Sequence, residues 1–263
     1  SAMRWNPVTE HLYLSRLRLL LTNDDGIGAE GLRVLAQKVS EKADVFIMAP
    51  SGNRSGVSNS ITMMKTLEIR SAGENMYSCS GTPVDCVVAA LRSDFFGDVK
   101  FDAVLSGINQ GANMGTDLIY SGTAAAARQA SLYDIPAIAL SVDSDDDNYN
   151  FNGLASFAAE NLDYIISLWR KGAFVNLNAF SSERCGRIVP ASLCNRDYHD
   201  KVIVEKSGDG WITRFSGGAL ETSGDSDNDF AVSRGRDIAF SLVASNPELL
   251  YRRGGMYGKD NSF

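Results

Sequence analysis

The sequence predicts an α/β protein, with a Rossmann-like three-layer α/β/α core on a mainly parallel sheet and a smaller β-rich C-terminal appendage. Two observations lead to this fold class. Short, nearly uninterrupted apolar runs alternate with segments whose apolar residues recur at helical spacing. The apolar runs contain few polar residues, which is typical of parallel strands that are buried on both faces.

The expected elements follow one another in order along the chain. Strands are expected at 17–22, 45–49, 103–105 and 137–142, with a β excursion at 61–70 and 76–79. Helices are expected at 32–39, 84–92, 121–132 and 151–169. Thr82 followed by Pro83 is typical of a helix start, with Thr82 as the N-cap. Shorter β-like runs follow near 173–178, 186–193, 201–205 and 211–215.

These patterns divide the chain into two parts. Residues 17–170 form the expected catalytic core. Residues 171–263 form the expected β-rich appendage and C-terminal element, to which we assign oligomerisation. Residues 1–3, Ser-Ala-Met, are interpreted as an expression scar.

Composition excludes several classes of protein. The chain has 263 residues and a formal charge of −7, without a run of Lys or Arg, which disfavours a stable complex with nucleic acid. It holds no signal-peptide core and no apolar stretch of 18 residues, so we expect a soluble, cytoplasmic protein without a membrane partner. The four cysteines lack C-x-x-C spacing, and we interpret them as reduced and mostly buried.

The most informative stretch near the start reads LLLTNDDGIGAEGL. Its glycines spell G-x-G-x-x-G between a strand and a helix, as in dinucleotide-binding proteins. Asp24 and Asp25 stand directly before the first glycine, however, where a pyrophosphate would meet two negative charges. The next strand also lacks the expected ribose-binding carboxylate at its end. The motif therefore favours a hard divalent cation, with an ordinary capped turn as the open alternative.

Three further polar segments belong to the same pattern. NRSGVSNS follows the second strand, SGINQGANMG follows the third, and YSGTAAAAR opens an Ala-rich helix whose free N–H groups favour a phosphate. Each segment alone is also compatible with a solvated loop or simple N-capping. Because successive β–α loops converge on one face of such a sheet, we expect them to build one polar site.

Together these motifs resemble the SurE family of metal-dependent nucleotidases. The matching stretches are LLLTNDDGIGAEGL, VFIMAPSGNRSGVSNSIT, CSGTPVDCV, DAVLSGINQGANMGTDLIYSGTAAAA and IPAIALS, in family order. The resemblance implies a phosphomonoesterase that hydrolyses nucleoside 5′- and/or 3′-monophosphates with a metal-activated water. It also implies one divalent ion, Mg²⁺ or Mn²⁺, per subunit of a homodimer or homotetramer.

The resemblance assigns roles to individual residues. The implied metal ligands are Asp24, Asp25, Ser55 and Asn109, of which Asp24, Asp25 and Asn109 are also the implied catalytic residues. The implied phosphate- or substrate-binding residues are Gly56, Ser58, Asn59, Asn113, Ser121, Gly122 and Thr123. The turn Gly81-Thr82-Pro83, with Asp85, is implied to line the same cleft. The chain departs from the family at Gln129-Ala130, where a Glu-Gly pair is usual.

Two other functions stay open at this point. A nucleotide-binding or sensing module would keep the pocket with little turnover, and a dinucleotide-dependent oxidoreductase would bind NAD(P) and tolerate EDTA. Covalent catalysis by Asp24 is disfavoured because the D-x-D spacing of such phosphatases is absent. The sequence leaves open the base preference, 5′ versus 3′ position, the metal, the general acid, the use of polyphosphate, and dimer versus tetramer.

Overall fold

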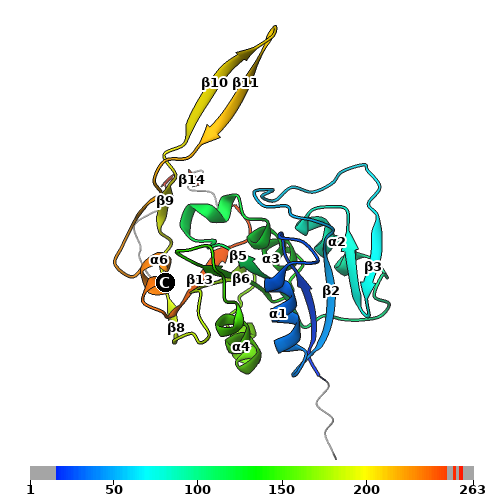
Figure 1. Cartoon of the computed structure of the whole chain (residues 1–263). Coiled ribbons are helices and arrows are strands. Elements are labelled where there is room, and N and C mark those ends of the chain that lie inside the picture. The colour runs from blue at the N-terminus through cyan, green and yellow to red at the C-terminus, as the bar shows by residue number, and fades with distance from the viewer. Residues whose placement is uncertain (1–15, 248–250, 253–254, 257–263) are drawn as a thin grey trace, which may run out of the picture.

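Figure 1 shows the computed structural model of the chain, which describes residues 16–247, 251–252 and 255–256. Nine strands within these ranges form a central sheet in the order β3-β4-β2-β1-β5-β6-β7-β13-β8. Its strands are β1 (Arg18–Thr22), β2 (Asp44–Pro50), β3 (Ile69–Gly73), β4 (Met76–Cys79), β5 (Ala103–Gln110), β6 (Ala137–Asp143), β7 (Ala173–Phe180), β8 (Ile188–Pro190) and β13 (Ile238–Ala244). The six strands from β4 to β7 in this order are parallel, whereas β3 and the β13–β8 pair run the other way. The predicted, mainly parallel sheet is confirmed.

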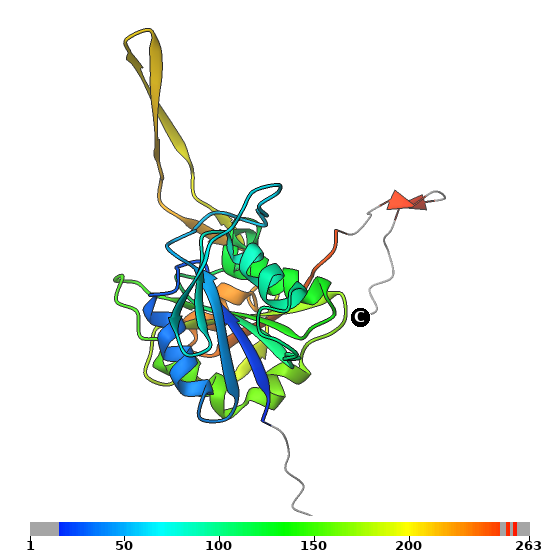
Figure 2. The same ribbon diagram turned by 90° about the vertical axis from the view of Figure 1, so that its right-hand side faces the viewer.

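Helices cover both faces of the sheet (Figure 2). One face carries α1 (Glu30–Val39), α4 (Asn152–Glu160) and α5 (Leu162–Ser167), and the other carries α2 (Pro83–Arg92) and α3 (Gly122–Leu132). β1 shows why this arrangement forms. Leu19 and Leu21 pack in the first layer and Leu20 in the second, and all three are fully buried. Because a strand's side chains alternate between faces, such a run requires cover on both sides.

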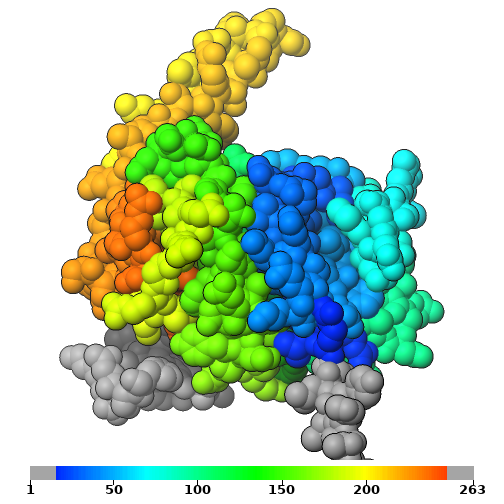
Figure 3. All heavy atoms as spheres, turned by 60° about the horizontal axis from the view of Figure 1, so that its bottom comes forward, coloured from blue at the N-terminus to red at the C-terminus, as the bar shows by residue number. Residues whose placement is uncertain are grey.

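The remaining strands form small separate sheets. They are β10 (Lys201–Ser207) with β11 (Gly210–Ser216), β9 (Asn195–Asp197) with β12 (Glu221–Ser223), and β14 (Tyr251–Arg252) with β15 (Gly255–Met256). The β10–β11 hairpin projects well beyond the body of the molecule (Figures 1 and 3). The expected β-rich appendage is therefore present. The central sheet nevertheless extends beyond residue 170, because β7, β8 and β13 belong to it.

The helix expected at 151–169 is not continuous, so that prediction was wrong. α4 ends at Glu160 and α5 begins at Leu162. Between them, the Asn161 side chain donates a 2.9 Å hydrogen bond to the Phe157 carbonyl oxygen. Asparagine side chains compete in this way for backbone groups that a regular helix needs.

The strand expected at 61–70 was also wrong for most of its length, since β3 begins only at Ile69. Thr62 directs both its N–H and its hydroxyl to the Asp85 carboxylate, at 2.8 Å and 2.6 Å. The segment is therefore anchored by a side chain at the start of α2 rather than by a neighbouring strand. β5, by contrast, runs to Gln110, five residues past its expected end at Leu105.

The topology brings two predicted segments to one place. β1 lies between β2 and β5, so the direction of the strand order reverses there. Open α/β sheets bind ligands outside the carboxyl ends of the strands at such a reversal. Asp24 and Asp25 lie just after the end of β1. Asn109 lies near the end of the neighbouring strand β5, a few residues beyond Ser106, which pairs in register with Thr22. No helix in the described ranges is long and apolar enough to cross a bilayer.

Candidate active site

A cavity of about 300 Å³ opens beyond the carboxyl ends of β1 and β5. The sequence-predicted residues that line it are Asp24, Ser55, Gly56, Asn109, Asn113 and Ser121. They come from the turn after β1, the loop after β2, the end of β5 with its following loop, and the start of α3. The polar segments that follow the strands therefore meet at one cavity.

Asp24 is held at the start of α3. Its side chain is almost fully buried, and both of its carboxylate oxygens accept hydrogen bonds. The Gly122 N–H donates to Oδ2 at 3.0 Å, and the Thr123 hydroxyl donates to Oδ1 at 2.6 Å. Gly122 and Thr123 thus contact Asp24, and neither is among the residues that line the cavity.

The N-terminus of α3 differs from our expectation of free N–H groups. The Gly122 N–H binds Asp24, and the Ala124 N–H donates to Ser121 Oγ at 3.0 Å, so Ser121 is a conventional N-cap. These two groups are therefore already used within the protein. The Ser121 hydroxyl hydrogen is not used in this cap, because the oxygen acts as the acceptor there.

Two carboxylates, Asp24 and Asp25, are neighbours in the turn after β1. Burial raises the pKa of Asp24, and hydrogen bonds from Thr123 and Gly122 oppose the rise. Burial raises the pKa of Asp25 to about 6, which a hydrogen bond from the Gln110 N–H opposes and the Asp24 charge reinforces. Within the described ranges, neither aspartate forms an ion pair with Lys, Arg or His. Unpaired buried negative charge is costly and favours a bound cation.

The neighbouring side chains supply oxygen atoms. Asn109 donates its amide N–H to the Gly111 carbonyl at 2.8 Å, which leaves the Asn109 amide oxygen as an acceptor, and Ser55 offers a hydroxyl. In the described part of the chain, no group of three or more His, Cys, Asp or Glu side chains is placed to hold a metal. An all-oxygen set of two carboxylates, an amide and a hydroxyl suits a hard cation such as Mg²⁺ or Mn²⁺. The residues present fit such an ion.

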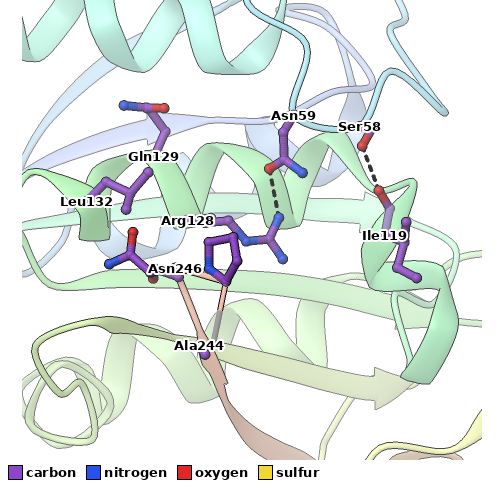
Figure 4. A pocket seen from close by; sticks show the side chains of 10 residues that line it. Ser58, Asn59, Ile119, Arg128, Gln129, Leu132, Ala244 and Asn246 are labelled. Atoms are coloured by element: carbon purple, nitrogen blue, oxygen red, sulfur yellow. Dashed lines mark hydrogen bonds between the residues drawn. The ribbon is translucent and has the colours of Figure 1, made fainter. Parts of the chain in front are cut away.

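Ser58 and Asn59 lie in a second pocket of about 480 Å³ beside α3 (Figure 4). Asn59 Oδ1 accepts a 2.7 Å hydrogen bond from Arg128, and the Ser58 hydroxyl donates to the Ile119 carbonyl at 2.6 Å. Neither residue lines the cavity that contains Asp24. Their expected role in binding the substrate's phosphate stays a prediction. Gln129, which departs from the family pattern, also lines this second pocket.

The turn at Thr82 does not line the cavity of Asp24. Thr82 is the N-cap of α2, as the Thr-Pro pattern predicted, and it also forms a capping box with Asp85. The Thr82 hydroxyl donates to the Ser60 carbonyl at 2.7 Å, and Asp85 binds Thr62. This turn therefore anchors the end of the loop that carries Ser55.

Sequence reasoning missed the polar layer that fixes Asn113. The Asn113 N–H donates to Asn178 Oδ1 at 2.9 Å, and the side-chain amides of Asn176 and Asn178 both donate to the Asn113 carbonyl at 3.0 Å. The Asn113 amide donates to Ser141 Oγ at 2.9 Å. The available signal was the pair of asparagines that interrupts the apolar strand AFVNLNAF at alternate positions.

Six further residues line the cavity that were not predicted: Gln110, Gly111, Ala112, Asp117, Tyr120 and Tyr198. The Tyr198 hydroxyl donates to Asp117 Oδ1 at 2.8 Å. Asp117 Oδ2 lies 2.8 Å from Arg196 Nε in a buried ion pair. Burial raises the pKa of Asp117, and the Arg196 charge opposes the rise. The segment of Tyr198 has no strong pattern of its own, so no local signal marked it.

An α/β fold with an acidic, oxygen-lined cavity at the reversal of strand order defines a class of ligand-binding α/β proteins whose site accepts a hard cation. The chain belongs to the SurE family, since residues 19–200 match the family model described as Survival protein SurE. A 5′-nucleotidase SurE of Treponema pallidum is 41% identical over 187 residues, which cover 69% of this chain and 100% of the relative.

Two further comparisons agree with this assignment. A 5′-nucleotidase SurE of Vibrio vulnificus is 50% identical over 126 residues, a match that spans 48% of this chain and 49% of that relative. The crystal structure of the SurE protein from Aquifex aeolicus is similar with a TM-score of 0.76 at 26% identity, covering 87% of this chain and 94% of the other. The predicted family and fold are confirmed.

Proposed function

We propose that this protein is a metal-dependent phosphomonoesterase that hydrolyses nucleoside 5′- and/or 3′-monophosphates to nucleoside and phosphate. The observation that carries the proposal is the pair Asp24 and Asp25 at the reversal of strand order, which has no basic partner within the described residues. Asp24 lines the cavity together with Asn109, and Asp25, which does not line it, accepts a hydrogen bond from the Gln110 N–H beside Asn109. The relatives from Treponema pallidum and Vibrio vulnificus are 5′-nucleotidases, which supports the same class of reaction.

In this proposal Asp24, Asp25, Ser55 and Asn109 hold one divalent ion per subunit, Mg²⁺ or Mn²⁺. When bound, such an ion supplies Lewis acidity toward a phosphoryl oxygen and lowers the pKa of a water molecule. The protein's contribution is orientation. Hydrogen bonds from Thr123 and Gly122 fix Asp24, and the Gln110 N–H fixes Asp25. Such supporting contacts keep ligand oxygens aimed at one point.

The substrate's phosphoryl group has its own partners in the proposal. The Ser121 hydroxyl keeps its hydrogen for a phosphate oxygen, and Asn113 presents a side-chain amide that is held by its hydrogen bond to Ser141 Oγ. Preorganised donors of this kind stabilise charge that develops in the transition state. The histidine in the described ranges, His199, lies beside Glu221 and does not line the cavity, so it is not placed to receive the phosphoryl group. This arrangement favours attack by water over a phosphohistidine route.

Asp24 is poorly suited to act as a covalent nucleophile. Both of its oxygens accept hydrogen bonds from α3, and these bonds fix the carboxylate in place. Its direct neighbour Asp25 would also repel a phosphate in the absence of a cation. Both facts support the role of Asp24 as a ligand.

We also propose that the chain assembles as a homodimer or homotetramer in the cytoplasm. The support for assembly is the β10–β11 hairpin, whose exposed apolar side chains include Val202, Ile203, Val204, Trp211, Ile212 and Phe215. An isolated two-stranded hairpin is only marginally stable, and an exposed apolar surface of this kind is typical of interfaces. The free, mostly buried cysteines support a reducing compartment.

The test is phosphate release from a panel of nucleoside 5′- and 3′-monophosphates with Mn²⁺, with Mg²⁺ and with EDTA. We expect release that depends on metal and is lost in Asp25→Asn while the variant keeps its circular dichroism spectrum. If folded protein binds nucleotides saturably but releases no phosphate, the protein is a nucleotide-binding module and not an enzyme. Saturable NAD(P) binding that is indifferent to EDTA would replace it with the oxidoreductase.

A further inference from the structure

Two exposed tyrosines line the cavity that contains Asp24 and Asn109. Tyr120 is 63% exposed and Tyr198 is 42% exposed. They come from distant parts of the chain: Tyr120 follows the short helix η1 (Gly115–Ile119), and Tyr198 follows β9 at the root of the projecting hairpin. Neither is needed to hold a cation or a phosphate, so the two rings require another explanation.

The Tyr198 ring is held in place by a buried network. Its hydroxyl donates to Asp117 Oδ1 at 2.8 Å, and Asp117 is paired with Arg196 at 2.8 Å, with both charged side chains less than 10% exposed. Thr116 Oγ1 donates to the Arg196 carbonyl at 3.0 Å and accepts from the Arg196 N–H at 3.1 Å. Because a buried ion pair adds little net stability, we interpret this network as a device that positions Tyr198.

The Tyr120 backbone is fixed from both sides. Its N–H donates to the Asp117 carbonyl at 2.9 Å, and its carbonyl accepts the Ser58 N–H at 3.0 Å. The following residue, Ser121, is the N-cap of α3. Asp117 therefore links the two tyrosines, through its backbone to Tyr120 and through its carboxylate to Tyr198.

The buried and exposed ends of the cavity suit different parts of a bound substrate. Asp24 is 4% exposed and marks the buried, charged end, where the phosphate of the substrate belongs. The leaving group must then extend toward solvent, where the exposed tyrosines lie. An aromatic ring fixed at its backbone loses little conformational entropy on binding, and it stacks on any nucleobase because every base has a π-face.

We propose that Tyr120 and Tyr198 form the nucleobase-binding wall of this site. The inference rests on the proposed phosphomonoesterase function and adds what selects the substrate. The two rings favour phosphomonoesters whose leaving group carries an aromatic base over those with a bare sugar or polyol. Since stacking reads no hydrogen-bond pattern, purine and pyrimidine nucleotides are accepted alike.

The test compares adenosine 5′-monophosphate with ribose 5-phosphate, which lacks the base. We expect kcat/KM with Mn²⁺ to favour the nucleotide in the wild type, and this preference to fall ~10-fold in Tyr120→Ala and in Tyr198→Ala, as the loss of one base–ring stack implies. The fall is expected in KM for the nucleotide, with both constants for ribose 5-phosphate unchanged. Tyr164→Ala is the matched control, because Tyr164 is similarly exposed but lies on α5 away from the cavity.

Tyr198→Phe separates the ring from the hydrogen bond to Asp117. It removes the hydroxyl but keeps the stacking surface, so we expect most of the nucleotide preference to survive. If Phe and Ala at this position lose the preference equally, Tyr198 acts only through Asp117, and the stacking role assigned to it is wrong. An unchanged preference in both alanine variants would overturn the proposal as a whole.

Failure of the proposed function gives a different result. If no monoester is hydrolysed, calorimetric titration of the same variants with adenosine 5′-monophosphate still measures how much Tyr120 and Tyr198 contribute to nucleotide affinity. Weaker binding in Tyr120→Ala and Tyr198→Ala, but not in Tyr164→Ala, would then support the wall in a binding module. Equal affinity in all variants would refute it.

Discussion

The Thr123 hydroxyl donates a 2.6 Å hydrogen bond to Asp24 Oδ1, and both side chains are buried. Thr123→Val keeps the shape of the side chain and removes the donor. We expect the free energy of unfolding to fall by about 1–3 kcal/mol and Mn²⁺ affinity to fall ~10-fold or more, because a supporting contact of a ligand is lost. Urea unfolding and calorimetry measure the two effects. Thr123→Ser keeps the hydroxyl, and equal losses in both variants would contradict this role.

Gly122 allows α3 to approach Asp24 closely. A Cβ atom at Gly122 would lie 2.7 Å from Asp24 Cβ and 2.9 Å from its Oδ2, so Gly122→Ala must displace the carboxylate or the helix. We expect a destabilisation of about 1–3 kcal/mol and a loss of kcat/KM of up to ~100-fold. Gly28→Ala is the control, since its Cβ meets no atom within 4 Å. Equal activity of the two variants would show that Asp24 has room to move.

Asp85 gives a prediction about pH. Burial raises its pKa, but hydrogen bonds from Thr62 and Thr82 outweigh burial and lower the pKa below its usual value. A lowered pKa means that the stabilisation is present above the unfolded-state pKa and is lost as the pH falls through the folded-state pKa. Asp85→Asn should therefore cost about 1–3 kcal/mol at neutral pH and much less in strong acid.

Urea unfolding of wild type and Asp85→Asn at neutral pH and near pH 3 measures this difference. The same cost at both pH values would mean that the charge of Asp85 does not stabilise the fold. Asp163→Asn, on the outer surface of α5, is a control whose effect we expect to be within about 0.5 kcal/mol at either pH.

The hairpin gives a prediction about assembly. Trp211 and Phe215 lie on one face of β11, and Val202 is paired directly with Phe215. Replacing both aromatic residues with Lys should lower the mass measured by light scattering, because charge on an apolar interface is costly to bury. Tyr164→Lys, which changes an exposed aromatic residue on α5 away from the hairpin, should leave the mass unchanged. If the wild type is monomeric at high protein concentration, the proposed homodimer or homotetramer is wrong.

Most of the fold could be predicted because buried parallel strands leave a direct trace in the sequence. β1 and β6 begin and end within a residue of their expected bounds, since all of their side chains except Arg18 and Asp143 are buried in the packed layers. Two of the misplaced elements, the helix at 151–169 and the strand at 61–70, share one cause. At Asn161 and Thr62, side chains take backbone or carboxylate partners that periodicity does not reveal.

The site could be predicted only where it follows the topology. Asp24 and Asn109 belong to strand ends that the fold must bring together. Tyr198 reaches the cavity through contacts between η1 and a segment about 80 residues later, which no local pattern encodes. Ser58 and Asn59 sit in an expected loop, but hydrogen bonds to Ile119 and Arg128 place their side chains in another pocket.

In the proposed function, Asp24 and Asp25 hold one divalent ion, and phosphate release depends on that ion. The most direct test is a Mn²⁺ titration of EDTA-treated protein, with phosphate release from a nucleoside 5′-monophosphate measured at each point for wild type and Asp25→Asn. We expect wild-type activity to rise from zero and saturate as each chain binds one ion, and we expect folded Asp25→Asn to stay inactive at those concentrations. Full wild-type activity in EDTA, or an equally active Asp25→Asn, would contradict it.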